Sequence, residues 1–443
     1  MKKISDIPFV VLRVILGRLS KSKIFRDSSW AVLGNGFGNG LLLLAGIIIA
    51  RLLGRDLYGE YGLAKTTILC ISGFATFGLG ISSTKYVAKA MCEDPKHLRS
   101  IINSSLIITC LFSSLIAICL YWFAPILSAY LLDSQLEGTL KMLGIIIIVK
   151  ALNTTQAGIL AGVKMFDTLA KNNIVASSLM VVSCVPFTYY WGLYGALSSL
   201  FLSQLLTSIF NQYYINNLIK QYPQCGSNWP YIKELTSFSF PIALQDSSFT
   251  ICNWLGILIL TKYSSVGEVA LYSAAAQWNA VVLMIPSLLT NVILSYLSST
   301  DGIEHKRTVV FMIRMNLICT VIPLILLYIL SDYIVALYGE DFASMKIVLL
   351  VQVSSTVFEC CSSVLRSEFI SRGRNWLIFS LRTVRDICQI YVIYLLLRLY
   401  AGVNGALWYA IVIIISSMVF FVVLSMVYHY IVRQSAVINN RMM

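Results

Sequence analysis

The chain has 443 residues, of which 58% are hydrophobic and 12% are charged, and its mean hydropathy is +0.79. Because a soluble domain carries roughly twice that share of charge, these values exclude a water-soluble globular protein. The net charge of +13 does not indicate nucleic-acid binding, since the basic residues are placed as a membrane topology requires.

Continuous apolar runs fill almost the whole chain. Each is long enough to cross the hydrocarbon core of a bilayer, which takes about 20 residues of helix, and none alternates as the strands of a membrane barrel do. The sequence therefore predicts an all-α membrane protein. Its twelve predicted transmembrane helices lie at 29–53, 61–83, 101–123, 138–160, 168–190, 193–219, 236–262, 269–297, 308–330, 345–370, 375–397 and 402–430.

These spans divide into a predicted N-lobe at 29–219 and a predicted C-lobe at 236–432. We expect a basic interfacial segment at 1–28, a linker at 220–235 and a tail at 433–443, all on the cytoplasmic side. The first segment lacks a small-residue cleavage site, so we do not interpret it as a signal peptide. Its lysines and arginines favour contact with anionic lipid.

The basic residues predict the orientation of the chain. Most lysines and arginines fall in the N-terminal segment and in the turns on the same side of the membrane. Because such residues gather in cytoplasmic loops, we expect a multi-pass membrane protein with both termini in the cytoplasm. The opposite side holds Arg51, Arg55, Lys262, Lys346 and Arg398.

Motifs for a metal or a cofactor are missing from the sequence. The 11 cysteines fall almost entirely within apolar runs and show no metal-ligand spacing. The string nearest to a phosphate-binding loop, at 62–67, lacks the second glycine and lies in a predicted span. We therefore expect no metal, no cofactor and no direct use of ATP.

Weak matches between the two halves recur at an offset of about 210 residues. Tyr61 overlies Tyr272, and the string Gly-Ala-Leu at 195–197 returns at 405–407. Because each half has an even number of spans, both halves run in the same direction. The repeat predicts two six-helix lobes related by a pseudo-twofold axis along the membrane normal, with a substrate path between them.

The junction of the first two spans reads Gly-Ile-Ile-Ile-Ala-Arg-Leu-Leu-Gly-Arg-Asp-Leu-Tyr-Gly-Glu-Tyr-Gly at 46–62. Phe-Gly-Leu-Gly follows at 77–80, before a basic segment from Lys85. With these motifs and twelve spans, nearly the whole chain resembles the O-antigen flippases (Wzx type) of the MOP superfamily, which are relatives of the MATE exporters and the lipid II flippase.

The resemblance implies a MOP/MATE-like fold and a transporter rather than an enzyme. Its expected cargo is an undecaprenyl-pyrophosphate-linked O-antigen oligosaccharide. The protein would move this lipid from the cytoplasmic to the periplasmic leaflet by alternating access, coupled to an ion or to the membrane potential. The expected partners are this lipid-linked oligosaccharide, the lipid bilayer and other O-antigen assembly proteins.

Two other functions stay open. A polysaccharide polymerase or ligase of the same pathway would also be basic and polytopic, but such enzymes resemble chains with one large periplasmic loop, and the predicted outer loops here are short. A MATE-type multidrug exporter is the other alternative, although no feature of the sequence indicates a pocket for small aromatic cations.

Ionisable residues inside the predicted spans are candidate site residues. A charge at mid-bilayer costs about 3 kcal/mol on insertion scales, so it requires a partner or a water-filled cavity. Arginine suits a pyrophosphate because its planar guanidinium engages two oxygens at once. The candidates for the substrate cavity are Lys65, Lys150, Glu359, Arg366, Arg382 and Arg385.

Each candidate also has a structural interpretation. Arg382 and Arg385 share a helix face near the predicted cytoplasmic end, but Arg382 stands four residues before Asp386, and these two charges can neutralise each other. Lys150 has no charge within one turn, which favours a cavity role over an ion pair with the glutamate of the tenth span. Lys65 lies closer to the end of its span, where a snorkelling side chain is the simpler interpretation.

Asp246 is the candidate for a coupling-ion or proton site, with Pro241 about one turn before it. At the repeat offset Asn35 overlies Asp246, so the repeat places polar groups on symmetry-related helices. Asn35 also lies in the glycine-rich stretch 34–40, for which a hinge and close helix packing both stay open.

Replacing Asp246 with Asn should abolish transport and leave membrane insertion intact, because the amide has nearly the same shape but cannot bind or release a proton. Accumulation of untranslocated lipid-linked sugar and the amount of protein in the membrane fraction measure the two effects. Full activity of the Asn variant would contradict the assignment.

Overall fold

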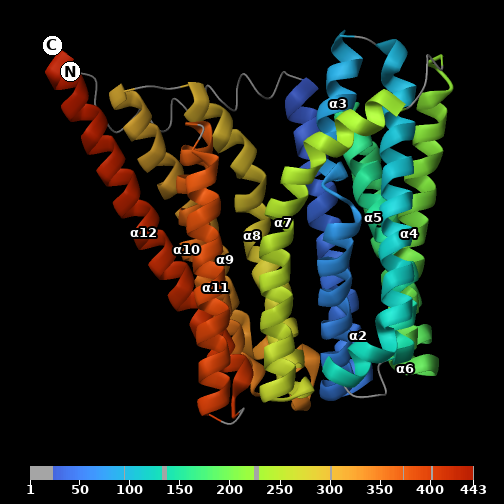
Figure 1. Cartoon of the computed structure of the whole chain (residues 1–443). Helices are drawn as coiled ribbons and strands as arrows, with labels where there is room; N and C mark the ends of the chain where they lie inside the picture. The colour runs from blue at the N-terminus through green and yellow to red at the C-terminus, as the bar shows by residue number, and fades with distance from the viewer. Residues whose placement is uncertain are drawn as a thin grey trace.

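A computed structural model describes residues 23–93, 95–131, 137–223, 229–299, 302–372, 374–400 and 403–442 (Figure 1). Every regular element in these ranges is a helix, which confirms the predicted all-α class. In chain order the α-helices are α2 (Lys23–Ala75), α3 (Leu79–Glu93), α4 (Leu98–Leu131), α5 (Glu137–Gly162), α6 (Phe166–Ile219), α7 (Trp229–Tyr263), α8 (Val266–Ser299), α9 (Gly302–Tyr338), α10 (Met345–Ser371), α11 (Asn375–Leu399) and α12 (Gly405–Met442), with short 3₁₀ helices at Pro95–His97 and Glu340–Phe342.

Two helices are kinked at glycines and each forms two rods. α2 has 53 residues and α6 has 54. At about 1.5 Å per residue, each helix would be more than twice as long as a bilayer core is thick. Gly54 (φ 72°) breaks α2, and Gly192 (φ 53°) breaks α6. A positive φ at these points favours glycine, which has no Cβ to clash with the backbone. The rods of each pair therefore connect through one residue instead of a loop.

The second predicted span is not continuous. Its helix ends at Ala75, and α3 begins at Leu79 after a turn in which Phe77 (φ 50°) and Gly78 (φ 69°) have left-handed backbone conformations. The expected unbroken helix over 61–83 was therefore wrong at this turn. The Phe-Gly-Leu-Gly string that supported the family resemblance contains the break.

The rods give the predicted number of crossings. Seven helices in the described ranges are long and apolar enough to cross a membrane by length and composition, and α2 and α6 are among them. α7, α8 and α11 have comparable lengths of 35, 34 and 25 residues. When the kinked helices are counted as two rods each and α3 as the continuation of α2, twelve rods result.

The rods alternate between two ends of the bundle. We call the end at the top of Figure 1, where α12 ends, the basic end; α3, α5, α8 and α10 also end there. The opposite end holds the kinks at Gly54 and Gly192 and the turns after α7, α9 and α11. Described basic residues near the basic end are Lys85, Lys89, Lys96, Arg99, Lys164, Lys171, Lys220, Lys233, Arg307, Arg372 and Arg374. That the basic end faces the cytoplasm stays a prediction.

The helices form two halves that lie side by side (Figure 1). In the first half α2 packs against α6 and α4 packs against α5; in the second half α8 and α12 both pack against α10. α12 leans away from the first half toward the basic end (Figure 1). The exact lobe boundaries expected at 219 and 236 remain predictions.

The halves meet where the second rod of α2 crosses α8. Gly62 and Ser273, which the sequence repeat pairs with each other, lie in direct contact, since a Cβ added at Gly62 would overlap the Ser273 side chain. Residues related by a twofold axis can touch each other only on the axis. The contact therefore places the pseudo-twofold axis between α2 and α8.

The crossing depends on a second glycine, Gly59. A Cβ added there would overlap the carbonyl oxygen of Val266 at the start of α8. Because that obstacle is backbone, it cannot turn aside as a flexible side chain can. The two helices therefore approach more closely here than any other residue type would allow.

Gly59→Ala should lower the melting temperature of the detergent-solubilised protein, because overpacking of this kind costs about 1–3 kcal/mol. Gly40→Ala is the matched control, since it lies in the same helix and has nothing within 4 Å of the added Cβ. Alanine is favoured over glycine in a helix by about 1 kcal/mol, so the control should be neutral or stabilising. Equal melting temperatures of the two variants would contradict the close contact.

Candidate functional site

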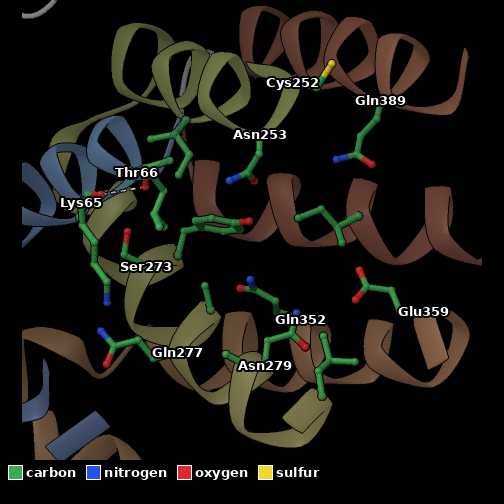
Figure 2. Close-up of a pocket in the computed structure, with 18 of the residues that line it drawn as sticks. Lys65, Thr66, Cys252, Asn253, Ser273, Gln277, Asn279, Gln352, Glu359 and Gln389 are labelled. Atoms are coloured by element: carbon green, nitrogen blue, oxygen red, sulfur yellow. Dashed lines mark hydrogen bonds between the residues drawn. The ribbon is translucent and has the colours of Figure 1, made fainter. Parts of the chain in front are cut away.

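A cavity of about 520 Å³ lies beside the crossing of α2 and α8, and we call it the main cavity (Figure 2). Its walls come from the second rod of α2 and from α7, α8, α10, α11 and α12. The volume falls within the range of small-molecule sites, roughly 300–1,000 Å³. Its polar and charged lining residues are Tyr58, Tyr61, Lys65, Thr66, Asn253, Tyr272, Ser273, Gln277, Asn279, Gln352, Glu359, Arg385, Asp386, Gln389 and Ser417.

Five amide side chains are the largest chemical group in the polar lining. Asn253 on α7 and Gln389 on α11 point into the cavity from one side, and Gln352 on α10 points in from the other (Figure 2). Gln277 and Asn279 extend this lining along α8. The main cavity therefore presents neutral hydrogen-bonding groups from four helices, α7, α8, α10 and α11.

Three of these amides have unsatisfied oxygens. The side-chain oxygens of Gln277, Asn279 and Gln352 are buried and accept no hydrogen bond from the described residues. A buried acceptor without a donor costs about 1–3 kcal/mol. A ligand or water that donates hydrogen bonds would recover this free energy, so the cavity suits a molecule rich in hydroxyl groups.

Lys65 lies at the edge of the main cavity, with its ammonium group directed toward Gln277 (Figure 2). Lys65 therefore points into the bundle and does not snorkel toward the end of its helix, which was the simpler interpretation of the sequence. Lys150 on α5 does not line the cavity, but it lies within electrostatic range of Lys65. Neither lysine forms an ion pair with a described residue, so the considered pair between Lys150 and Glu359 does not form here.

The C-terminal half holds a cluster of three arginines and two carboxylates. Glu359 lies within electrostatic range of Arg366, Arg382 and Arg385. Asp386 accepts hydrogen bonds from Arg385, at 2.8 Å from Nε and 2.5 Å from Nη2. The i,i+4 partner considered for Asp386 was Arg382, whose Nε lies 4.0 Å from the other carboxylate oxygen. The closer partner of Asp386 is thus its sequence neighbour.

This cluster is divided between two cavities. Glu359 and Arg385 line the main cavity. Arg366 and Arg382 line a smaller cavity of about 250 Å³ between α7, α10 and α11, which we call the side cavity. Asp386 contributes to the walls of both. The structure therefore brings five of the predicted cavity residues to two adjoining sites and leaves Lys150 outside both.

Polar residues follow one face of α10. Gln352, Glu359 and Arg366 are spaced seven residues apart, which is close to two helical turns, or about 10 Å. They change from amide to carboxylate to guanidinium toward the basic end. This spacing is visible in the sequence and would have placed Gln352 in the site, whereas Asn253, Gln277 and Gln389 have no comparable signal.

An ion pair joins the two halves at the opposite end of the bundle. Arg55 donates from Nη2 to Glu268 Oε1 at 2.7 Å and from Nε to the carbonyl oxygen of Gly267 at 3.1 Å. The other oxygen of Glu268 accepts the backbone N–H of Ala406 at 2.8 Å. The group therefore joins α2, α8 and the start of α12. Nearby, Tyr58 and Gln277 hydrogen-bond across the same boundary between the halves.

The two candidates for the coupling ion, Asp246 and Asn35, have side chains outside the described part of the structure. Their helices, α7 and α2, are described. Their role stays a prediction from the sequence.

The comparison with known families identifies the chain. The profile of the family described as polysaccharide biosynthesis protein matches residues 24–301, which is more than half of the chain, so the protein belongs to this family. The chain is 21% identical to stage V sporulation protein B of Bacillus subtilis (strain 168) over 331 residues. That match covers 68% of this chain and 64% of the sporulation protein, so it spans less than two thirds of the relative's length.

Solved structures show the same fold. The structure of a multidrug resistance MATE family transporter of the MOP superfamily, in an inward-facing conformation, superposes with a TM-score of 0.75 at 17% identity, covering 89% of this chain and 95% of that one. A MOP superfamily transporter from Pyrococcus furiosus gives a TM-score of 0.66 at 16% identity, covering 91% and 94%. The protein therefore has the two-lobed, MATE-like transporter fold and is a multi-span membrane protein.

Glu268→Ala should lower the melting temperature more than Arg55→Ala. The Glu268 side chain is only 12% exposed, against 33% for Arg55. Loss of the Glu268 carboxylate also removes the hydrogen-bond acceptor of the Ala406 N–H at the start of α12. A double-mutant cycle of this pair should give a coupling free energy of about 1 kcal/mol. The control cycle uses Lys89 and Glu93, whose charged groups lie 3.7 Å apart and are largely exposed. Exposed ion pairs of this spacing have a coupling free energy of about 0.3 kcal/mol. Equal coupling in both cycles would contradict a role of this pair in joining the two halves.

Proposed function

We propose that this protein is a flippase for a lipid-linked oligosaccharide. Its cargo would be an undecaprenyl-pyrophosphate-linked O-antigen repeat unit, carried from the cytoplasmic to the periplasmic leaflet of the bacterial inner membrane. The observation that carries the proposal is the amide lining of the main cavity with its three unsatisfied oxygens. Membership of the polysaccharide biosynthesis family supports the same cargo class.

The chemistry of the main cavity favours a sugar over a cationic drug. Sugar hydroxyls both donate and accept hydrogen bonds, as amides do, so the two surfaces can satisfy each other. A cationic drug would need an available carboxylate, but Glu359 and Asp386 both lie among arginines. Lys65 adds a positive charge at the edge of the cavity. These charges would repel a cation, which weakens the multidrug-exporter alternative.

Alternating access would require the contact at the opposite end to break and form again. The Arg55–Glu268 ion pair is suited to this because partly exposed ion pairs contribute little net free energy. Under the predicted orientation the basic end faces the cytoplasm and receives the cargo there. The energy would come from an ion or the membrane potential, for which Asp246 and Asn35 remain the candidates.

Deletion of the gene in its host bacterium should remove the surface glycan completely, including glycans that carry a single repeat unit. Gel analysis of the extracted glycolipid measures this. A polymerase or ligase would give a different result, because loss of a polymerase leaves single-unit glycan at the surface. Retention of single units in the deletion strain would rule out the flippase. Drug efflux, measured in the same strain, should stay unchanged.

Complementation with Gln352→Leu tests the amide lining in the same strain. The variant should restore less than about one tenth of the surface glycan, since the leucine has nearly the same volume but cannot hydrogen-bond a sugar. Gln221→Leu is the control, because Gln221 is exposed in the turn after α6 and lines neither cavity. Equal restoration by both variants would count against the cavity as the sugar site.

A further inference from the structure

A third cavity, of about 510 Å³, lies at the opposite end of the bundle, and we call it the end cavity. Its walls come from the residues after the kink of α2, from the turn between α7 and α8, and from the 3₁₀ helix after α9. Its lining residues are polar or lack a side chain, namely Arg55, Asp56, Ser265, Gly267 and Asp341. Water in this cavity therefore reaches the ion pair between Arg55 and Glu268.

Two helices run from the end cavity to the main cavity. On α2, Asp56 lines the end cavity and Tyr61 lines the main cavity. On α8, Gly267 lines the end cavity and Tyr272 lines the main cavity. In each helix the two residues are five positions apart, which is about 8 Å of helix. The region between the two cavities is therefore thin, and its composition decides whether water and ions can cross it.

Aromatic rings lie in this thin region, and we call them the aromatic layer. They come from α2, α8, α9, α12 and the 3₁₀ helix Glu340–Phe342, and all are between 0 and 6% exposed. The members of the layer are Tyr58, Tyr61, Tyr272, Tyr338, Phe342 and Tyr409. The centroids of the Tyr58 and Tyr61 rings lie 5.9 Å apart, and those of the Tyr272 and Tyr409 rings lie 4.5 Å apart.

Phe342 reaches across the boundary between the two halves. Its ring packs on Tyr58 of the N-terminal half and on Tyr338, with centroid distances of 5.8 and 5.5 Å. Adjacent residues of α8 anchor these two tyrosines. Gln277 donates a hydrogen bond to the Tyr58 hydroxyl, and Trp278 Nε1 donates to the Tyr338 hydroxyl at 3.2 Å. The Phe342 ring therefore fits between two rings that are held in place.

A barrier to ions must exclude water, and an apolar constriction blocks ions because water leaves it. The ion pair does not meet this condition, since the Arg55 side chain is 33% exposed and lines the end cavity. The rings of the aromatic layer do meet it, because they are almost fully buried. The opposite end thus has a water-exposed contact and a dry layer in series.

We infer that the aromatic layer is the seal between the main cavity and the end cavity, whereas the ion pair of Arg55 and Glu268 holds the halves together without excluding ions. Phe342 is the closing part of the seal, because a short 3₁₀ helix of one half carries it and the other half receives it. Opening at the opposite end requires this ring to leave Tyr58. The inference goes beyond the proposed cargo, since the seal is the same for any solute in the main cavity.

Cys252 tests the seal, because this native cysteine lines the main cavity and can report whether a reagent reaches it. The full-length protein keeps Cys252, its other cysteines are replaced by alanine, and spheroplasts and inverted vesicles present the two sides of the membrane to an impermeant maleimide. Ser265→Cys in a cysteine-free protein identifies the side that the end cavity faces. From that side, Phe342→Ala should label Cys252 at least about tenfold faster than the parent, because a large-to-small substitution in a packed layer leaves a gap.

Two control variants show whether the effect belongs to the aromatic layer. Phe369 is also buried, at 2% exposed, but it lies in a separate core cluster of the C-terminal half, so Phe369→Ala should change the labelling rate less than about twofold. Arg55→Ala should raise it less than about fivefold, since a partly exposed ion pair contributes little. An unchanged rate in Phe342→Ala would overturn the seal, and so would an equal rise in either control.

Phe342→Leu separates the seal from misfolding. Leucine keeps most of the apolar volume, so this variant should give the wild-type amount of protein in the membrane fraction and the wild-type gel-filtration profile. It still lacks the ring that packs on Tyr58, so the rate of Cys252 labelling should rise at least about threefold. The parent rate in this folded variant would overturn the role of the Phe342 ring.

The labelling assay needs no cargo, so it is independent of the surface-glycan assay. If the deletion strain lacks all surface glycan but Phe342→Ala labels at the parent rate, only the seal fails. If the deletion strain retains single repeat units at the surface but Phe342→Ala labels faster as expected, only the flippase assignment fails.

Discussion

The close crossing of α2 and α8 is the constraint on which the other features depend. Gly59 and Gly62 let the two helices touch along the pseudo-twofold axis without side chains between them. The same crossing brings Arg55 within 2.7 Å of Glu268 and so joins the two halves at the opposite end of the bundle. Both helices of the crossing also line the main cavity (Figure 2).

Charge pairing distinguishes the two cavities. A buried charge is costly unless it is paired, and Arg385 in the wall of the main cavity is paired with Asp386. Five neutral amides also line the main cavity, and they suit hydroxyl groups. Arg366 and Arg382 line the side cavity instead. Under the proposed function, a sugar held by neutral contacts would be easier to release than one held by charges.

Hydropathy and charge placement predicted the twelve crossings, and the repeat predicted the two lobes, because these signals are spread over many residues. The backbone and side-chain geometry of single residues was harder to predict from the sequence. The kink at Gly54, the break after Ala75 and the preference of Asp386 for Arg385 over Arg382 depend on backbone and side-chain angles that spacing rules do not contain. Uncharged amides such as Gln277 were missed because they cost less in a membrane than a charge and so do not stand out in the sequence.

The two halves contribute unequally to the site, and this bears on how it could alternate between the two sides of the membrane. Among the described lining residues of the main cavity, the N-terminal half supplies only the stretch from Tyr58 to Leu69, and every other wall belongs to α7, α8, α10, α11 or α12. The side cavity lies wholly between helices of the C-terminal half. A pivot about the axis between Gly62 and Ser273 would therefore move one wall of the main cavity and leave its other walls and the side cavity together. Such a motion would change which end is open without taking either cavity apart.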